Sequence, residues 1–373
     1  MTQAAFVDHG TVIRSLAERW LRMVAEDSEV RAGGGDFVCS PAGLWLALTA
    51  VAAGARGETA QELRELLGAA GAEAAGSATA VARGLAATEA LTVATGAWAR
   101  TPVYRAFRES LPDIGVGQFD PADTAPVETW IREETGGLIG ELPGTPDEDT
   151  LLMLVNALVL TGRWESPFPG ADTGPARFTD ASGGRHEVET MHQTLPPADA
   201  WAVGSTAVAE LRCRAGSGRL PARARFVLGP HGASAAEVLP AAWAAEPART
   251  AFDADEVRIA LPRCSLRTSL DATGHLAGLG VHWATSDEAD FAGMSPEPLK
   301  VGQVAQESVI KVAEKGVEAA AATAVMMAIP AGVARPRRIE RIAFDRPFGV
   351  VVLDGSGSVP LFAGWQATAP VSP

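Results

Sequence analysis

The hydrophobic positions in the first part of the chain recur with the spacing of α-helices. A first amphipathic helix is predicted from one apolar face, made up of Val12, Leu16, Trp20, Leu21 and Val24. A second helix is predicted to start at Ser40-Pro41, because serine suits the cap position and proline the first turn. The residues 44–55 are apolar on nearly every side, so this helix should be buried. Thr59 and Glu62 fit a capping box that opens a third helix.

Further along, the apolar residues form short runs that are typical of strands. The runs 91–100 and 151–164 look like central strands, and the segment 127–142 between them predicts an amphipathic helix ending at a Gly-Gly pair. The stretch 232–249 predicts a helix and a loop. From about residue 176, strand-like runs alternate with turns; they are RFVLG, EVRIALPR, ESVIKVAE, FGVVVLD and VPLFAGW. Early helices and late strands indicate one α+β domain over residues 1–373.

The charge balance narrows the range of partners. The 373 residues include 31 Lys and Arg against 45 Asp and Glu, a net charge of −14. Such a charge repels nucleic acid and anionic membranes, so we expect neither as a partner. The N-terminal residues show no signal peptide, and no stretch of about 18 apolar residues occurs without charge. We therefore expect a soluble cytoplasmic protein, with export by an unmarked route as the alternative.

Motifs for catalysis and metal binding do not occur in the sequence. Cys39, Cys213 and Cys264 lie far apart, which predicts buried free thiols rather than a disulfide framework or a zinc site. His186 and His192 suit no known ligand pair and are expected at the surface. No nucleophile elbow, phosphate loop or metalloprotease motif is found. We therefore expect no enzymatic activity, no metal and no cofactor.

Five stretches, in order along nearly the whole chain, resemble the serpin family of protease inhibitors, in its bacterial type. They are 37–68, 130–168, 256–295, 307–325 and 344–365. The resemblance implies a serpin fold with a large central mixed β-sheet, two further sheets, about eight or nine helices and an exposed reactive loop over about 314–340. It also implies a monomer that inhibits a serine-type protease as a suicide substrate. The cleaved loop would enter the main sheet and trap the acyl-enzyme.

The resemblance places the reactive-loop hinge in an Ala-rich segment. Its residues are Glu314, Gly316, Val317, Glu318, Ala319, Ala320, Ala321, Ala322 and Thr323. Composition alone favours a helix here, because alanine has the highest helix propensity. The position between two strand-like runs and the resemblance favour a strand that can slide into a sheet. Gly316 then provides backbone freedom at the bend.

As a strand, this hinge has two different faces, because alternate side chains point to opposite sides. One face is small and nearly apolar and consists of Val317, Ala319, Ala321, Thr323 and Val325. The other face carries the only charge, Glu318, with Ala320, Ala322, Ala324 and Met326. The first face can enter a core without overpacking, and the charged face can stay in water.

The scissile region is predicted by counting about sixteen or seventeen residues from Glu314, which the resemblance implies for a loop that inserts as a strand. The count reaches Pro330 and Ala331, so the predicted scissile region is Ile329, Pro330 and Ala331. The surroundings, MMAIPAGVA, are small and apolar, which predicts an elastase-like or subtilisin-like protease as the partner. The stretch from Glu314 to Pro347 is longer than the family leads us to expect, with the extra residues in GVARPRRIER.

A polar sheet-opening cluster is also implied by the resemblance. Its members here are Ser40, Gly43, Asn156, Trp164 and Gln306. The family usually has serine at Gly43, histidine at Gln306, and threonine or serine at Val317, so the network is altered. This leaves an alternative open, a non-inhibitory binding or chaperone protein with the serpin fold. The small hinge side chains favour inhibition.

Overall fold

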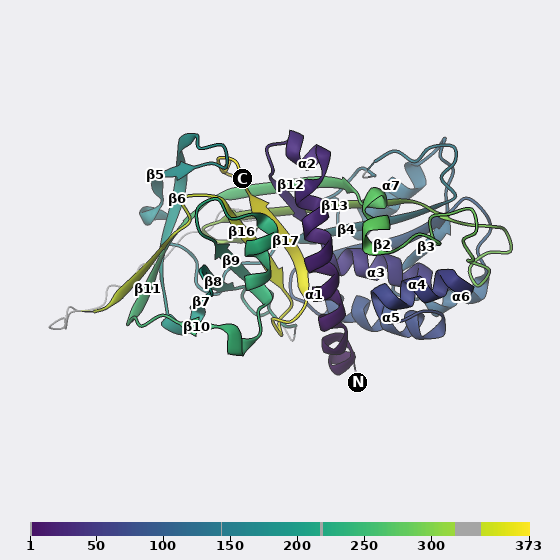
Figure 1. Ribbon diagram of the computed structural model, residues 1–373, viewed down its shortest axis with the longest axis horizontal. Coiled ribbons are helices and arrows are strands. Elements are labelled where there is room, and N and C mark those ends of the chain that lie inside the picture. The colour runs from purple at the N-terminus through teal and green to yellow at the C-terminus, as the bar shows by residue number, and fades with distance from the viewer. Residues whose placement is uncertain (1, 143, 217–218, 318–336) are drawn as a thin grey trace.

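The computed structural model describes residues 2–142, 144–216, 219–317 and 337–373. Helices α3 to α6 gather at one end of an elongated molecule, and strands β5, β6 and β11 lie at the other end (Figure 1). The α-helices of the described part are α1 (Thr2–Glu26), α2 (Ser28–Ala32), α3 (Pro41–Ala52), α4 (Gly57–Leu67), α5 (Ala72–Ala86), α6 (Arg105–Ser110), α7 (Ala125–Glu134) and α8 (Ala235–Val238).

The predicted helix start at Ser40 is confirmed. The Ser40 side chain accepts a hydrogen bond from the Gly43 N–H, and every residue of α3 is buried. The predicted capping box at Thr59 and Glu62 is wrong. Helix α4 begins at Gly57. The two side chains instead accept hydrogen bonds from backbone groups far along the chain. Thr59 accepts from the Asp290 N–H, and Glu62 accepts from the N–H groups of residues 282–284.

Three sheets complete the described fold. The main sheet has the order β12 (Cys264–Asp271), β13 (Val301–Ala313), β4 (Leu152–Leu160), β2 (Leu91–Ala99), β3 (Gly115–Gln118), with β14 (Gly316–Val317) paired to β13. Its β4–β13 and β2–β3 pairs are parallel and its other pairs antiparallel, so the predicted mixed sheet is confirmed.

The two other sheets have seven and four strands. A seven-stranded antiparallel sheet has the order β1 (Phe37–Cys39), β17 (Pro360–Gln366), β16 (Phe348–Leu353), β9 (Arg223–Leu228), β8 (Thr206–Arg212), β7 (Ala200–Val203), β10 (Thr250–Ala251). A four-stranded sheet has the order β15 (Ile339–Ala343), β11 (Glu256–Pro262), β6 (Arg185–Leu195), β5 (Gly174–Thr179). The eight α-helices and three sheets of the described residues fit the fold class that the sequence predicts.

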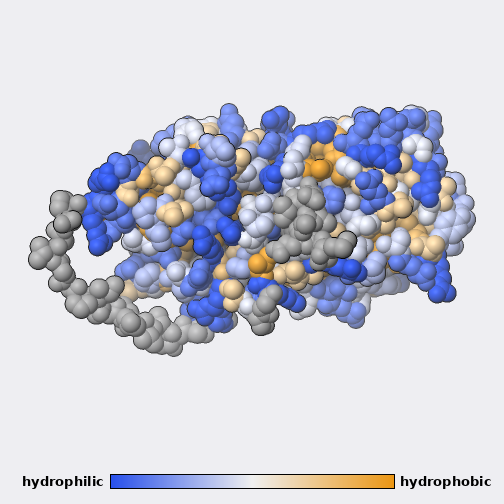
Figure 2. All heavy atoms as spheres, turned by 90° about the horizontal axis from the view of Figure 1, so that it is seen from below, coloured by the Kyte–Doolittle hydropathy of each residue, from blue (hydrophilic) through white to orange (hydrophobic). Residues whose placement is uncertain are grey.

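The main sheet is covered on both faces. One face lies on the large core that α1, α3 and α5 share with the sheets. On the other face, Val127 and Ile131 of α7 pack against Met153, Val155 and Ala157 of β4. The face drawn in Figure 2 is mostly hydrophilic, with small separate apolar patches. None of the helices in the described part has the length and apolar character to cross a bilayer.

The cysteines and histidines lie where the sequence predicts. All three cysteines are buried and free, and burial raises the pKa of Cys213 and of Cys264 to about 12. His186 and His192 are exposed, and His186 pairs with Asp180 at 2.6 Å. Across the described residues, no group of three or more possible ligands could hold a metal ion.

Candidate functional site

The centre of the main sheet contains a seam that ends where the hinge begins. Strands β4 and β13 pair in parallel from Leu152 to Val159. Beyond that point β4 ends at Leu160, while β13 continues to Ala313. The last residues of β13 therefore extend past β4, which leaves a place for another strand beside them.

The first residues of the hinge occupy this place. Gly316 and Val317 pair antiparallel with Ala313 and Val312 of β13 on one side. On the other side, Gly316 forms a bridge with Arg163, and the Val317 N–H donates to the Gly162 oxygen at 2.7 Å. The start of the hinge thus already lies between β13 and the segment that follows β4.

Close packing explains the glycine at position 316. A Cβ there would lie 2.1 Å from the Gly162 oxygen and 2.7 Å from the Arg163 Cα. Val317 is fully buried in the main core, on the face that the alternation assigns to it. The remaining predicted hinge residues, from Glu318 to Thr323, and the scissile region Ile329, Pro330 and Ala331 lie outside the described residues.

A polar clamp holds the hinge just before this point. The Arg263 guanidinium and the Thr173 hydroxyl both donate to the Glu314 carboxylate, with the Arg263 Nε and the Thr173 Oγ1 each 2.8 Å away. The Trp164 N–H donates to the Lys315 oxygen at 2.9 Å, and the Trp164 indole donates to the Ala313 oxygen at 2.9 Å. Trp164 therefore lies at the hinge and fixes the turn between β13 and β14.

Glu314 should make the stability of the protein sensitive to acid. Burial alone would raise its pKa, but hydrogen bonds from Arg263 and Thr173 bring the pKa below its ordinary value. The stabilisation is therefore present above the pKa of about 4.3 in the unfolded chain and is lost as pH falls through the lower folded pKa. We expect Glu314→Gln to lower the melting temperature at pH 7 and to change little near pH 3.

This expectation has a matched control. Glu288→Gln replaces an exposed glutamate far from the hinge and should be neutral at every pH. Melting curves of the parent and both variants from pH 3 to pH 7 give the comparison. A Glu314→Gln effect that is equally large at pH 3 would contradict a charge-dependent clamp.

Four of the five predicted cluster residues meet beneath the seam. The Ser40 N–H donates to the Gln306 Oε1 at 2.6 Å, and the Gln306 Nε2 donates to the Ser40 oxygen at 3.0 Å and to the Asn156 Oδ1 at 3.2 Å. The Asn156 Nδ2 donates in turn to the Thr95 Oγ1 at 2.7 Å. The bond between Asn156 of β4 and Gln306 of β13 crosses the seam and must break if the strands part. The fifth, Trp164, lies apart from this cluster.

The unusual residues of the cluster fit one another. A Cβ on Gly43 would lie only 1.8 Å from the Asn156 Oδ1, so a side chain at position 43 would require the Asn156 amide to move. The side-chain amide of Gln306 is long enough to reach both the backbone of Ser40 and the side chain of Asn156. Thr95 was not predicted, because nothing in its strand pattern distinguishes it from a core residue. The altered cluster is therefore still a connected network, but its hydrogen-bond donors differ from those of the residues that the family usually has at these positions.

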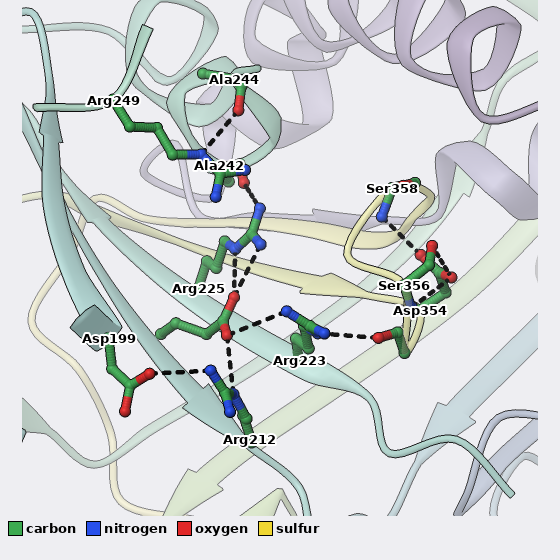
Figure 3. A network of polar contacts seen from close by, with 12 residues as sticks. Asp199, Arg212, Arg223, Arg225, Ala242, Ala244, Arg249, Asp354, Ser356 and Ser358 are labelled. Carbon is green, nitrogen blue, oxygen red and sulfur yellow. Dashed lines mark hydrogen bonds and ion pairs between the residues drawn. The ribbon is translucent and has the colours of Figure 1, made fainter. Parts of the chain in front are cut away.

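A second polar network, also missed from the sequence, joins strands β8 and β9 (Figure 3). The buried carboxylate of Glu210 on β8 contacts three guanidinium groups, those of Arg212, Arg223 and Arg225. Burial alone would raise the pKa of Glu210, but Arg225 above all brings it below its ordinary value. The Glu165 N–H donates to the Arg212 oxygen at 2.8 Å, and the preceding residue, Trp164, contacts the hinge. The network therefore lies next to the hinge.

Comparisons with known proteins agree with this geometry. The family model described as Serpin (serine protease inhibitor) matches residues 13–368. A serpin-Z6C of Oryza sativa subsp. japonica is 30% identical and the match covers 94% of this chain and 95% of that protein. The leukocyte elastase inhibitor of Bos taurus is 31% identical over 64% of each chain. The crystal structure of Serpin48 from Tenebrio molitor matches with a TM-score of 0.81 at 24% identity and covers 99% of both chains. With the family model matched over nearly its whole length, the chain belongs to the serpin family, whose members typically inhibit serine proteases.

Proposed function

We propose that this protein is a suicide-substrate inhibitor of serine-type proteases and not an enzyme. It acts as a monomer, and its cleaved reactive loop inserts between β4 and β13 while the protease is still attached as an acyl-enzyme. The observation that carries the proposal is the position of Gly316 and Val317, which fill the first two places of such a strand.

The register of β14 supports insertion of the rest of the hinge. If the pairing of Val317 with Val312 continues along β13, Thr323 comes opposite Gln306 and Ala321 opposite Ser308. Ser308 and Gln306 are buried on the core face. The hinge positions opposite them, 321 and 323, therefore need small side chains. Glu318 comes opposite Lys311, and opposite charges on facing residues stabilise a strand pair by about 0.2–1 kcal/mol.

The free energy of such an insertion is large enough to distort a bound protease. About a dozen inserted residues add roughly a dozen ladder hydrogen bonds, each worth about 1 kcal/mol net. The total compares with the whole stability of a typical domain, about 5–15 kcal/mol. If the dragged ester leaves the oxyanion hole, each lost donor slows deacylation by about 10²–10³. The acyl-enzyme would then persist.

The alternative of a non-inhibitory serpin rests on the altered cluster. The cluster residues Gly43, Asn156 and Gln306 are compatible in shape and fully buried, and a single side-chain hydrogen bond between them crosses the seam among the described residues. Opening the seam also separates the backbone ladder between β4 and β13, but an inserted strand would replace those hydrogen bonds. The extra cost from the cluster is then that of one side-chain hydrogen bond, about 1 kcal/mol. This favours the inhibitory proposal.

The target class follows from the scissile region. Small apolar residues around Ile329, Pro330 and Ala331 suit the pocket of an elastase-like or subtilisin-like enzyme, and the relative from Bos taurus is named as an inhibitor of leukocyte elastase. Arg335 precedes Pro336, which makes a poor bond for trypsin-like enzymes. We expect elastase and subtilisin to lose activity on a small substrate after stoichiometric mixing, and trypsin to keep it.

The same mixture locates the bond. Mass spectrometry of the C-terminal peptide released from the complex should show a start close to Pro330 or Ala331. A peptide that starts after Arg337 or Arg338, together with inhibition of trypsin alone, would contradict the predicted scissile region.

A further inference from the structure

Strand β2 of the main sheet has a free edge over part of its length. On one side β4 pairs with all of it, from Leu91 to Ala99. On the other side β3 covers only Gly96 to Ala99, and before the strand begins Thr88 forms a bridge with Leu220. Between these two contacts, on the side away from β4, residues 91–95 have no neighbouring strand in the described part of the chain. Alternate N–H and C=O groups of this stretch therefore point to an unfilled edge.

A cavity of about 500 Å³ runs along this free edge. Pockets that bind ligands typically measure about 300–1,000 Å³. The cavity opens between the α5 side and the α7 side of the sheet, which lie below and above β2 and β3 in Figure 1. Its apolar walls are Leu46 of α3, Ala82 and Ala86 of α5, Leu91, Ile114 and Trp130 of α7.

Charged groups of opposite sign mark the two ends of the cavity. Arg219 lies at the start of β2, because its neighbour Leu220 bridges Thr88. Glu134 lies one helical turn from Trp130, whose ring packs against Gly96 and Gly115 at the other end of the free edge. Neither charge has an ion-pair partner among the described residues, whereas Asp113 in the wall pairs with Arg83 at 2.9 Å.

A buried hydroxyl adds a polar anchor in the middle. Thr95 lines the cavity and is 5% exposed, and its Oγ1 accepts the hydrogen bond from Asn156. Its own hydroxyl proton has no acceptor among the described residues, so it can donate to an occupant. A row of backbone donors and acceptors, a hydroxyl donor and two opposite end charges match the chemistry of an extended peptide.

We propose that this cavity binds an extended peptide segment of a partner protein, about five residues long, which adds a strand to the free edge of β2. Both neighbours on this edge, β3 and Leu220, run parallel to β2, so the peptide runs parallel as well. Its first residue then lies at Arg219 and its last at Glu134. The segment carries an acid at the first position, small or β-branched residues between, and a base at the last.

The probe is the capped peptide acetyl-Glu-Val-Thr-Val-Lys-amide, and its control is acetyl-Lys-Val-Thr-Val-Glu-amide, which has the same composition with the end charges exchanged. Binding to the whole protein is measured by isothermal titration calorimetry. The first peptide should bind about five- to tenfold more tightly, since two cross-strand charge pairs contribute about 1 kcal/mol together. The double variant Arg219→Glu, Glu134→Lys should reverse this preference.

A pair of α5 variants separates this cavity from the seam, where a strand-forming peptide could also enter. Ala86 is exposed at the cavity, so Ala86→Trp should fold and abolish binding of the first peptide. Ala72→Trp, on an exposed position of the same helix outside the cavity, should leave binding unchanged. Equal affinity for both peptides, or binding that survives Ala86→Trp, would overturn the proposal. So would an Ala86→Trp effect on 8-anilinonaphthalene-1-sulfonate while neither peptide binds, because the site would then hold a small organic molecule.

Discussion

Cutting the reactive loop once between Ala328 and Val333 is expected to raise the melting temperature of this protein by about 15 °C or more. The cut frees the hinge to continue from Val317 along β13 as a new central strand. Roughly a dozen ladder bonds and several buried methyl groups then outweigh the loss of one peptide connection. The unfolding entropy of a domain of this size is about 0.8 kcal/mol/K, so each kcal/mol raises the melting temperature by about 1.3 °C and a dozen raise it by about 15 °C.

The sign of the change is diagnostic, because a cut loop lowers the stability of most proteins. A thiol protease or a metalloprotease can make the cut without being trapped, and mass spectrometry verifies that it is single. Melting is then followed by circular dichroism before and after the cut. An unchanged or lower melting temperature would rule out insertion and would favour the non-inhibitory alternative.

The second large effect is expected from Ala321→Arg, which should turn the inhibitor into a substrate. In the continued register Ala321 lies opposite Ser308, which is fully buried. An unpaired charge in that position costs several kcal/mol, so insertion slows and deacylation wins. We expect the rate of inhibition to fall by about 100-fold or more, with normal cleavage of the loop.

Ala322→Arg provides the matched control. Ala322 falls on the opposite face, opposite Glu307, which is buried under the α7 side of the sheet and held by Arg267 at 2.7 Å. The sequence predicts that the face of the hinge with Ala322 stays in water. The burial of Glu307 shows instead that this side of the main sheet is covered at that position. An arginine at 322 would still meet a carboxylate, so its cost should be small. Equal loss of inhibition in both variants, measured with the same protease, would contradict the two-face interpretation of the hinge.

The sequence predicts those parts of the fold that local patterns determine. Ser40 before Pro41 predicts the start of α3, and the apolar runs predict β2 and β4, because caps and strand patterns depend on near neighbours. Helix α5 was not predicted, since its alanines and glycines give a weak amphipathic pattern. Thr59 and Glu62 were misread because distant backbone groups compete for their side chains.

The candidate site shows the same division. The alternation of small residues predicts the buried position of Val317, which needs only the period of a strand. The contacts of Gly43 with Asn156, and of Glu210 with three arginines, join segments far apart in the chain. No local pattern encodes them. The resemblance supplied the position of the cluster, while the reason for its unusual residues is visible only in three dimensions.

The central claim is that a cleaved loop carries a protease into the main sheet as a covalent ester, and the most direct test is to look for that ester. The protein is mixed with subtilisin or elastase, boiled in detergent and separated on a denaturing gel, with the protease's serine-to-alanine variant as control. We predict a band at the combined mass of the protease and the N-terminal part of the chain, which the control does not give. Complete cleavage of the loop with no such band, and with the protease fully active afterwards, would contradict the account.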